Sequence, residues 1–183
     1  MIRRFTSRST RTSSQRNRVA VLAAGIGATA VLGTGVASAA TASAASWVDP
    51  VKQYTLSAGF AQSGSHWAAK HSGQDFAVPT GTEVVAAHGG TVVKAGPNGA
   101  GDGPAYGNAI VVKHGNGTYS QYAHLSRVDV RIGQVVATGQ HLALSGSTGN
   151  STGPHLHFEI RTTPNYGSAI DPVTFLRAKG VTV

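Results

Sequence analysis

The feature that most constrains the fold is a succession of short apolar runs separated by turn-forming residues. The runs are rich in Val, Ile, Tyr and Leu, and Gly, Asn, Pro or Ser occupies most of the gaps between them. This pattern predicts β-strands joined by tight turns, and no stretch carries the long apolar stripe of an amphipathic helix. We therefore expect one small all-β domain of antiparallel sheets, with strands at 82–87, 90–95, 108–114, 118–124, 134–138, 141–145 and 155–161.

Residues 1–45 are typical of a leader that is removed on export. Six arginines and no acidic residue lie within residues 1–18, residues 19–40 are almost wholly apolar, and Ala-Ser-Ala occurs at 37–39 and 42–44. A basic head, an apolar run and small-residue sites predict a secretory signal peptide, here followed by a short linker. We therefore expect residues 46–183 to form the mature domain, which is secreted and leaves the membrane after cleavage.

Two other interpretations of the leader remain open. An apolar run of about twenty residues can span a bilayer as an uncleaved anchor. Its content of Ala, Gly and Thr and its two cleavage-like sites favour removal instead. The pair Arg3-Arg4 suggests a twin-arginine signal, although the surrounding residues lack the rest of that motif.

The charge of the chain comes mostly from the leader. The whole chain has 15 basic and 7 acidic residues and a net charge of +8; without the six leader arginines, nine basic residues remain and the balance is +2. Nucleic-acid binding would need Lys and Arg clustered on one face, so we expect no nucleic-acid partner. There is no cysteine, so packing, and a bound metal if there is one, must stabilise the domain without disulfides.

The run at 155–161 carries both core and chemistry. Because side chains alternate along a strand, His155, His157 and Glu159 share one face, and the apolar residues between them share the other. Neighbours on one face lie about 6.5 Å apart, so one histidine can bind a metal while the other faces the metal-bound water. Glu159 either orients a ligand from behind or is a solvated strand residue.

His71 and Asp75 complete a set of metal-binding residue types. Zinc accepts imidazole and carboxylate ligands, and three protein ligands leave a fourth position open for water. A zinc ion bound in this way makes a nucleophile at neutral pH. A His-x-x-x-Asp pair occurs often by chance, but together with His-x-His in a cysteine-free β domain it predicts a hydrolytic metal site.

The other histidines fall into two groups. His124 ends an alternating run before an expected loop, where an imidazole can enter a groove and move protons near pH 7. Surface or hydrogen-bonded core positions are expected for the remaining four, which are His66, His88, His114 and His141.

Residues 96–108 are rich in Gly and Pro and predict a flexible loop. Long loops in small β domains often border a site, and a tolerated surface insertion is the other interpretation.

Three segments in this order resemble the lysostaphin/LytM-type zinc metallopeptidases, a family that cleaves peptidoglycan. The likeness runs from about Ser57 to Leu176. The segments are His71-Ser-Gly-Gln-Asp75-Phe-Ala-Val-Pro, Tyr122-Ala-His124-Leu-Ser and Gly149-Asn-Ser-Thr-Gly-Pro-His155-Leu-His157-Phe-Glu.

The resemblance implies one Zn²⁺ per chain, held by His71, Asp75 and His157. It implies that His124 and His155 are the catalytic histidines beside a zinc-activated water. The implied fold is a small antiparallel β domain, related to barrel-sandwich folds, with loops that wall a narrow groove. The implied activity is endopeptidase cleavage of cross-links or interpeptide bridges in bacterial peptidoglycan. We therefore expect residues 46–183 to be a secreted catalytic domain that associates with the cell wall as a monomer.

Two functions of other classes remain open. A relative that has lost its ligands would be a non-catalytic wall-binding or amidase-activating domain, but this chain keeps all three ligands and both further histidines. The segment from Gly133 to Gly146 resembles the paired hairpins of biotinyl or lipoyl carriers, but no lysine stands in a carrier-like motif. The resemblance leaves open which bond is cut and which histidine is the general base.

Overall fold

The computed structural model describes residues 46–183 except residues 66 and 68. The expected leader at 1–45 and His66 lie outside the described residues, so the boundary between leader and mature domain stays a prediction. Among the described residues, no helix is long and apolar enough to cross a bilayer.

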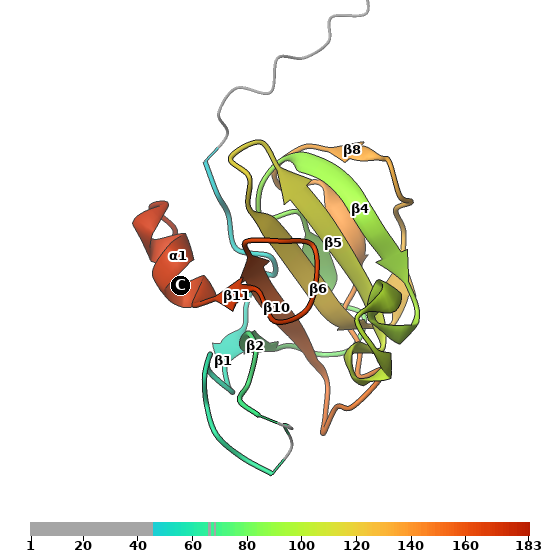
Figure 1. The fold of residues 1–183 in the computed structure, drawn as a ribbon, viewed down its shortest axis with the longest axis vertical. Helices are drawn as coiled ribbons and strands as arrows, with labels where there is room; N and C mark the ends of the chain where they lie inside the picture. Colours follow the sequence, from blue (N-terminus) through green and yellow to red (C-terminus); the bar gives the residue numbers. More distant parts are fainter. Residues whose placement is uncertain (1–45, 66, 68) are drawn as a thin grey trace, which may run out of the picture. The chain divides into compact units, whose positions relative to one another are not determined.

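Antiparallel strands make up most of the regular structure in the described chain, with two 3₁₀ turns and a short helix (Figure 1). The strands are β1 Thr55–Leu56, β2 Gln74–Ala77, β3 Glu83–Val85, β4 Gly90–Gly96, β5 Asn108–His114, β6 Tyr119–Leu125, β7 Arg127–Val128, β8 Val135–Val136, β9 His141–Leu144, β10 His155–Arg161 and β11 Ala169–Ile170. The 3₁₀ turns are η1 Asn98–Gly101 and η2 Pro104–Tyr106, and the helix is α1 Pro172–Ala178.

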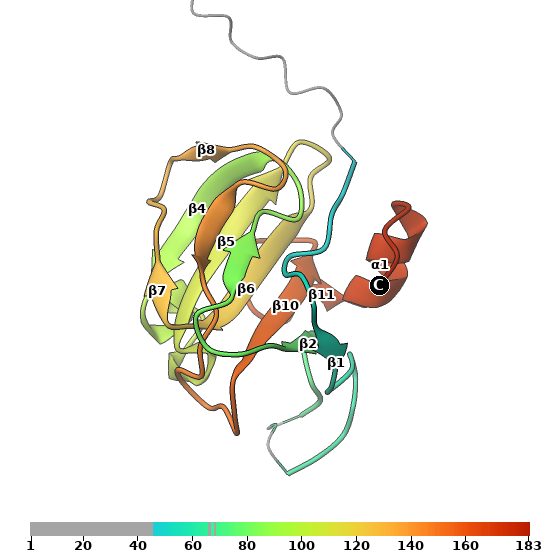
Figure 2. The same cartoon turned by 180° about the vertical axis from the view of Figure 1, so that it is seen from behind.

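The described strands form two open sheets (Figures 1 and 2). The larger sheet has the order β1-β2-β10-β6-β5-β4-β8, with β11 paired to β10, and the smaller has the order β3-β9-β7. All the pairings are antiparallel, and neither sheet closes into a barrel. This confirms the expected all-β fold of antiparallel sheets.

The core contains apolar side chains of both sheets. On β10, Leu156, Phe158 and Ile160 are fully buried, as the alternation of the sequence predicts. The ring of Phe158 meets Phe76 of β2 and Tyr122 of β6 at centroid distances of 6.1 and 5.3 Å. Burial of each large apolar side chain contributes about 1.5–3 kcal/mol, so β10 is anchored firmly by one face and its other face is free for chemistry.

The seven expected strands are all present, with ends shifted by up to two residues. Sequence patterns missed the two-residue strands β1, β7 and β11, which are too short to show alternation. They also missed α1, which is too short for an apolar stripe. Its start signal was visible, because the Asp171 side chain accepts hydrogen bonds from the backbone N–H of Val173 and Thr174, and Pro172 follows it.

The first described residues pack into the fold beside two of the histidines. Trp47 is buried, stacks on His88 at 4.7 Å, and meets the edges of His114 and Phe175 at 4.8 Å. His114 Nδ1 donates to the carbonyl oxygen of Gly89 at 3.0 Å, and its Nε2 lies 2.9 Å from the Ser120 hydroxyl. Burial lowers the pKa of His114 to about 4, against the opposing effect of the Gly89 hydrogen bond.

We predict that His114 makes the fold acid-sensitive. Its folded pKa of about 4 lies below the ordinary value of 6.5. Its contribution is therefore complete above pH 6.5 and is lost as the pH falls toward 4. Between pH 7 and pH 5 the wild-type free energy of unfolding should fall by about 2 kcal/mol more than that of His114→Gln.

Urea unfolding with a chelator in every sample measures this difference without a metal contribution. The control is Lys113→Gln, which replaces an exposed residue of β5 that carries no imidazole and should keep the wild-type pH dependence. Parallel pH profiles for wild type and His114→Gln would contradict the prediction.

Candidate metal centre

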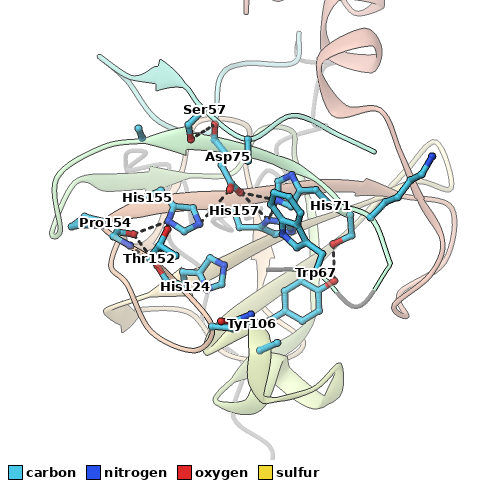
Figure 3. A pocket seen from close by; sticks show the side chains of 18 of the residues that line it. Ser57, Trp67, His71, Asp75, Tyr106, His124, Thr152, Pro154, His155 and His157 are labelled. Atoms are coloured by element: carbon cyan, nitrogen blue, oxygen red, sulfur yellow. Dashed lines mark hydrogen bonds and ion pairs between the residues drawn. The ribbon is translucent and has the colours of Figure 1, made fainter. Parts of the chain in front are cut away.

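Three side chains from separate parts of the sequence converge on one point. His71 precedes β2, Asp75 lies on β2, and His157 lies opposite Asp75 on β10. His71 Nε2 is 3.0 Å from His157 Nδ1 and 3.1 Å from Asp75 Oδ1, and His157 Nδ1 is 2.9 Å from Asp75 Oδ1. All three residues are buried (Figure 3). The structure therefore brings together the three residues expected to bind a metal.

Gly73 allows this convergence. A Cβ at this position would lie 2.4 Å from the carbonyl oxygen of Phe158 and 2.9 Å from side-chain atoms of His157 and Glu159. Real Cβ atoms do not approach other atoms so closely, so a larger residue would push the chain away from β10. The glycine between His71 and Asp75 therefore brings both residues against the same strand.

Hydrogen bonds determine which nitrogen each imidazole presents to the cluster. His71 Nδ1 lies 2.9 Å from the carbonyl oxygen of Gly59, which only accepts, so this nitrogen donates and Nε2 keeps its lone pair. His157 Nε2 lies 2.9 Å from Glu159 Oε1, which leaves Nδ1 for the cluster. Carboxylate and carbonyl partners of this kind commonly orient metal-binding histidines.

The donor set fits a divalent cation such as zinc. Two nitrogen lone pairs and a carboxylate oxygen about 3 Å apart repel one another unless a positive charge lies between them. Ligand bonds of about 2.0–2.2 Å in a tetrahedral site place ligand atoms roughly 3.3 Å apart, close to the spacing seen here. Three protein ligands would leave one coordination position open.

The ionisable groups of the cluster favour positive charge at its centre. Burial raises the pKa of Asp75, but hydrogen bonds and charge from His157 and His71 outweigh it, and the pKa falls far below its ordinary value. The pKa of Glu159 falls to about 2, because the effects of His157 and Arg161 exceed that of burial. Burial lowers the pKa of His157, but the two carboxylates raise it overall to about 9. A metal cation must therefore compete with a proton at this ring.

His155 and His124 lie next to the three clustered residues (Figure 3). His155 Nδ1 lies 2.8 Å from the carbonyl oxygen of Gly153, and its Nε2 lies 3.6 Å from Asp75 Oδ2. His124 Nδ1 lies 2.7 Å from the carbonyl oxygen of Thr148, and the two rings are 4.6 Å apart. Both Nδ1 atoms are hydrogen donors, so both Nε2 atoms can accept a proton.

Burial and the neighbouring charges keep His124 neutral. Burial lowers its pKa to about 4, and the positive charges of His157 and His155 act in the same direction. A neutral imidazole at pH 7 can act as a proton acceptor.

A β-bulge turns His124 toward the cavity. Tyr122 and Leu125 both belong to the main core. In a regular strand, residues that share a face are separated by an even number of positions, and these two are three positions apart. The register between β5 and β6 shifts at this point, and His124 has a φ of 59°, in the left-handed region. Strain of this kind often occurs at functional sites. The sequence predicted a histidine at the end of a strand, but it contained no signal for the bulge.

The five residues line one cavity of about 680 Å³ (Figure 3). Ser57, Ala77 and residues 151–154 also line it. Residues 96–108 do not form a remote insertion, because Asp102, Ala105 and Tyr106 of this segment line the cavity and two 3₁₀ turns order it.

Glu159 is fully buried, so its interpretation as a solvated strand residue is wrong. It accepts hydrogen bonds from His157, from the Tyr106 hydroxyl at 2.7 Å and from Arg161 Nε at 2.6 Å. Sequence reasoning missed Tyr106 and Arg161. Arg161 had a signal, because it is two residues beyond Glu159 on the same face of the strand.

The remaining described histidines lie outside the cavity lining. His114 and His88 pack with Trp47. His141 lies between Glu83 and Asp129, with its ring nitrogens 3.2 and 2.8 Å from their carboxylates. The core or surface roles expected for these three residues are confirmed.

The matching family model covers residues 69–172, which include all five residues of the cavity cluster. This chain belongs to peptidase family M23. The resemblance found in the sequence is thereby confirmed, and membership of a peptidase family argues against a carrier domain.

Relatives and solved structures support this membership. The chain is 46% identical over 92 residues to the peptidoglycan DD-endopeptidase ShyA of Vibrio cholerae, covering 50% of this chain and 20% of that protein. It is 41% identical over 112 residues to the glycyl-glycine endopeptidase ALE-1 of Staphylococcus capitis, covering 60% and 30%. The catalytic domain of the antimicrobial peptidase lysostaphin from Staphylococcus simulans superposes with a TM-score of 0.61 at 35% identity, covering 68% and 92%. The matched region thus spans less than a third of either curated relative.

The left-handed backbone at His124 predicts an unusual order of stability. Glycine adopts this conformation freely, whereas a residue with a Cβ pays roughly 1–2 kcal/mol. We expect the free energy of unfolding of His124→Gly to exceed that of His124→Ala by about 1 kcal/mol.

The control pair is Lys113→Gly and Lys113→Ala at an exposed position of β5, where alanine should be the more stable. Denaturant unfolding in the presence of a chelator measures all four variants. Alanine being the more stable residue at both positions would contradict the prediction.

Proposed function

We propose that this chain is a secreted zinc endopeptidase that hydrolyses peptide bonds in the cross-links or interpeptide bridges of bacterial peptidoglycan. The observation that carries the proposal is the triangle of three ligand atoms about 3 Å apart, at the wall of a cavity that two further histidines also line. Membership of the M23 family supports it, as do relatives named as peptidoglycan and glycyl-glycine endopeptidases.

His71, Asp75 and His157 would hold one Zn²⁺ per chain. Bound zinc polarises a carbonyl group and lowers the pKa of water enough to supply a nucleophile at neutral pH. Gly59 and Glu159 hold the two imidazoles in the tautomers that the ligand role requires. Asp75 stays ionised at neutral pH, because the histidines beside it stabilise its charge.

His124 and His155 would move the protons of the reaction. One Nε2 would accept a proton from the attacking water. The other imidazole would have to carry a proton on Nε2 as well, since its Nδ1–H is bonded to a backbone carbonyl, and would donate that Nε2 proton to the developing oxyanion or to the leaving amine. The low pKa of His124, about 4, keeps this imidazole neutral, so its Nε2 lone pair is open to a proton at neutral pH. Both imidazoles are oriented by backbone carbonyl groups, so neither needs to reorganise during the reaction.

The proposal includes the location and assembly of the protein. Residues 1–45 would direct export and be removed, and residues 46–183 would act as a monomeric catalytic domain at the cell wall. A non-catalytic wall-binding role has less support, because all three ligands and both further histidines are present.

Separate alanine variants of the two histidines test the mechanism. Treatment with a chelator should abolish lysis of purified walls, and added zinc should restore it. His124→Ala and His155→Ala should each lose about 10²–10⁴-fold in rate while retaining one zinc per chain.

Zinc content by elemental analysis and wall lysis are measured on the same samples, with His141→Ala as the control that keeps both. Lysis at the wild-type rate by either variant would remove that histidine from the mechanism. Lysis that survives complete metal removal would end the zinc proposal.

Digestion of purified muropeptides tests the substrate class. We expect cleavage of peptide bonds within cross-linked stems or bridges, with the glycan left intact, and mass spectrometry of the products locates the bond. A panel with direct D-Ala cross-links and with glycine bridges separates the two bond types named for ShyA and ALE-1. Intact cross-links in every member after incubation with the zinc-loaded protein would contradict the proposal.

A further inference from the structure

A buried ionic network lies behind the cluster, and it extends to the glycine-rich segment at 96–108. Arg161 is at its centre and is fully buried. Its Nε lies 2.6 Å from Glu159 Oε2, Nη1 lies 2.5 Å from Asp102 Oδ2, and Nη2 lies 2.7 Å from Gln121 Oε1. One guanidinium group therefore joins two carboxylates from distant parts of the chain.

Arg161 and Tyr106 together fix the orientation of Glu159. Glu159 Oε1 accepts from His157 Nε2 and the Tyr106 hydroxyl, while Oε2 accepts from Arg161 Nε. With both oxygens occupied, the carboxylate cannot rotate without breaking bonds in a buried site. The imidazole of His157 is therefore held with Nδ1 toward His71 and Asp75.

Asp102 performs two separate tasks with its two oxygens. Oδ2 contacts Arg161 and also accepts from Gln121 Nε2 at 3.3 Å. Oδ1 contacts Lys94 Nζ at 2.6 Å, and Lys94 also donates to Asn165 Oδ1 at 3.0 Å. One oxygen thus faces the network behind the metal cluster, and the other binds Lys94, which in turn contacts Asn165.

Charge balance explains why this network depends on Asp102. Arg161 faces two carboxylates, and Lys94 supplies the second positive charge, so the four groups are neutral together. A buried guanidinium that loses one carboxylate must bind another partner or shift toward the remaining carboxylate. Here the remaining carboxylate is Glu159, the residue that orients His157.

We propose that Asp102 is a positioning residue for the metal centre: through Arg161 and Glu159 it fixes His157, and so couples segment 96–108 to metal affinity. The inference rests on the proposed function, because it takes His157 as a zinc ligand. It assigns segment 96–108 a role beyond lining the cavity.

The central test is the zinc dissociation constant of Asp102→Asn, measured by competition with a chromogenic chelator well below the melting temperature. Loss of an outer partner of a metal ligand typically costs 10- to 100-fold in affinity or activity. Asp102 is one contact further out, so we expect a weakening of about three- to tenfold. The kcat should fall by a similar factor, with KM changed less than about twofold.

Two control variants separate this role from a structural one. Lys94→Met breaks the contacts of Asp102 Oδ1 and Asn165 but keeps the pair between Asp102 and Arg161, so zinc affinity should stay within about twofold of wild type. Ile160→Val removes a methylene from the core face of β10 and should lower stability without changing zinc affinity. Wild-type zinc affinity in Asp102→Asn, or an equal loss in Ile160→Val, would overturn the inference.

A double-mutant cycle tests the route through Glu159. Tyr106→Phe removes the other non-ligand donor to this carboxylate and keeps the ring. If both residues act through Glu159, their effects are coupled. The fold-change in zinc affinity of the double variant, Tyr106→Phe with Asp102→Asn, should then differ by about threefold or more from the product of the two single fold-changes. A simple product would refute this route.

Arg161→Lys is the replacement if Asp102→Asn does not fold. Lysine keeps the charge but cannot reach both carboxylates and Gln121 with one planar group, so zinc affinity should again fall by about three- to tenfold. Wild-type affinity would overturn the inference. If the wild-type protein does not bind zinc, the proposed function itself fails; if it binds zinc and these variants bind equally well, only the role of Asp102 fails.

Discussion

The pairing of β2 with β10 is the contact on which the rest of the site depends. It places Asp75 opposite His157, and Gly73 lets the chain before β2 return close enough for His71 to join them. The lone pairs of two imidazoles and a carboxylate repel one another at these distances unless a proton or a metal cation lies between them. The core therefore has to hold the two strands in register, and the buried apolar face of β10 does this.

The opposite face of β10, together with Asp75 of the neighbouring β2, carries a row of groups that alternate between acceptor and donor. Asp75 and Glu159 flank the ring of His157, and Arg161 follows Glu159 along the strand. Buried charges are costly, and each one here has a partner of opposite sign or a donor within hydrogen-bond distance. One face of β10 thus packs in the core, and the other carries His157 and the groups that bind it.

Two departures from regular structure lie beside the proposed chemistry. A bulge with left-handed backbone aims His124 at the cavity, and glycines allow the tight turns of segment 96–108 beside Tyr106. Regular backbone geometry is given up where the proposed function requires a particular side-chain direction. The surrounding sheet supplies the stability that offsets the resulting strain. The proposed endopeptidase mechanism uses these irregular positions together with the regular ones on β2 and β10.

Local patterns in the sequence were enough to predict the strands and the two faces of the run at 155–161, because alternation depends only on neighbouring residues. Residue types and spacing, with the family resemblance, indicated the set of His71, Asp75, His124, His155 and His157. The pair between Asp102 and Arg161 joins residues 59 positions apart, and no local pattern encodes such a contact. Likewise, the burial of Glu159 and the bulge at His124 depend on what the neighbouring strands place beside them. Only the tertiary structure decided these features, since each is a relation between strands that the periodicity of one strand cannot contain.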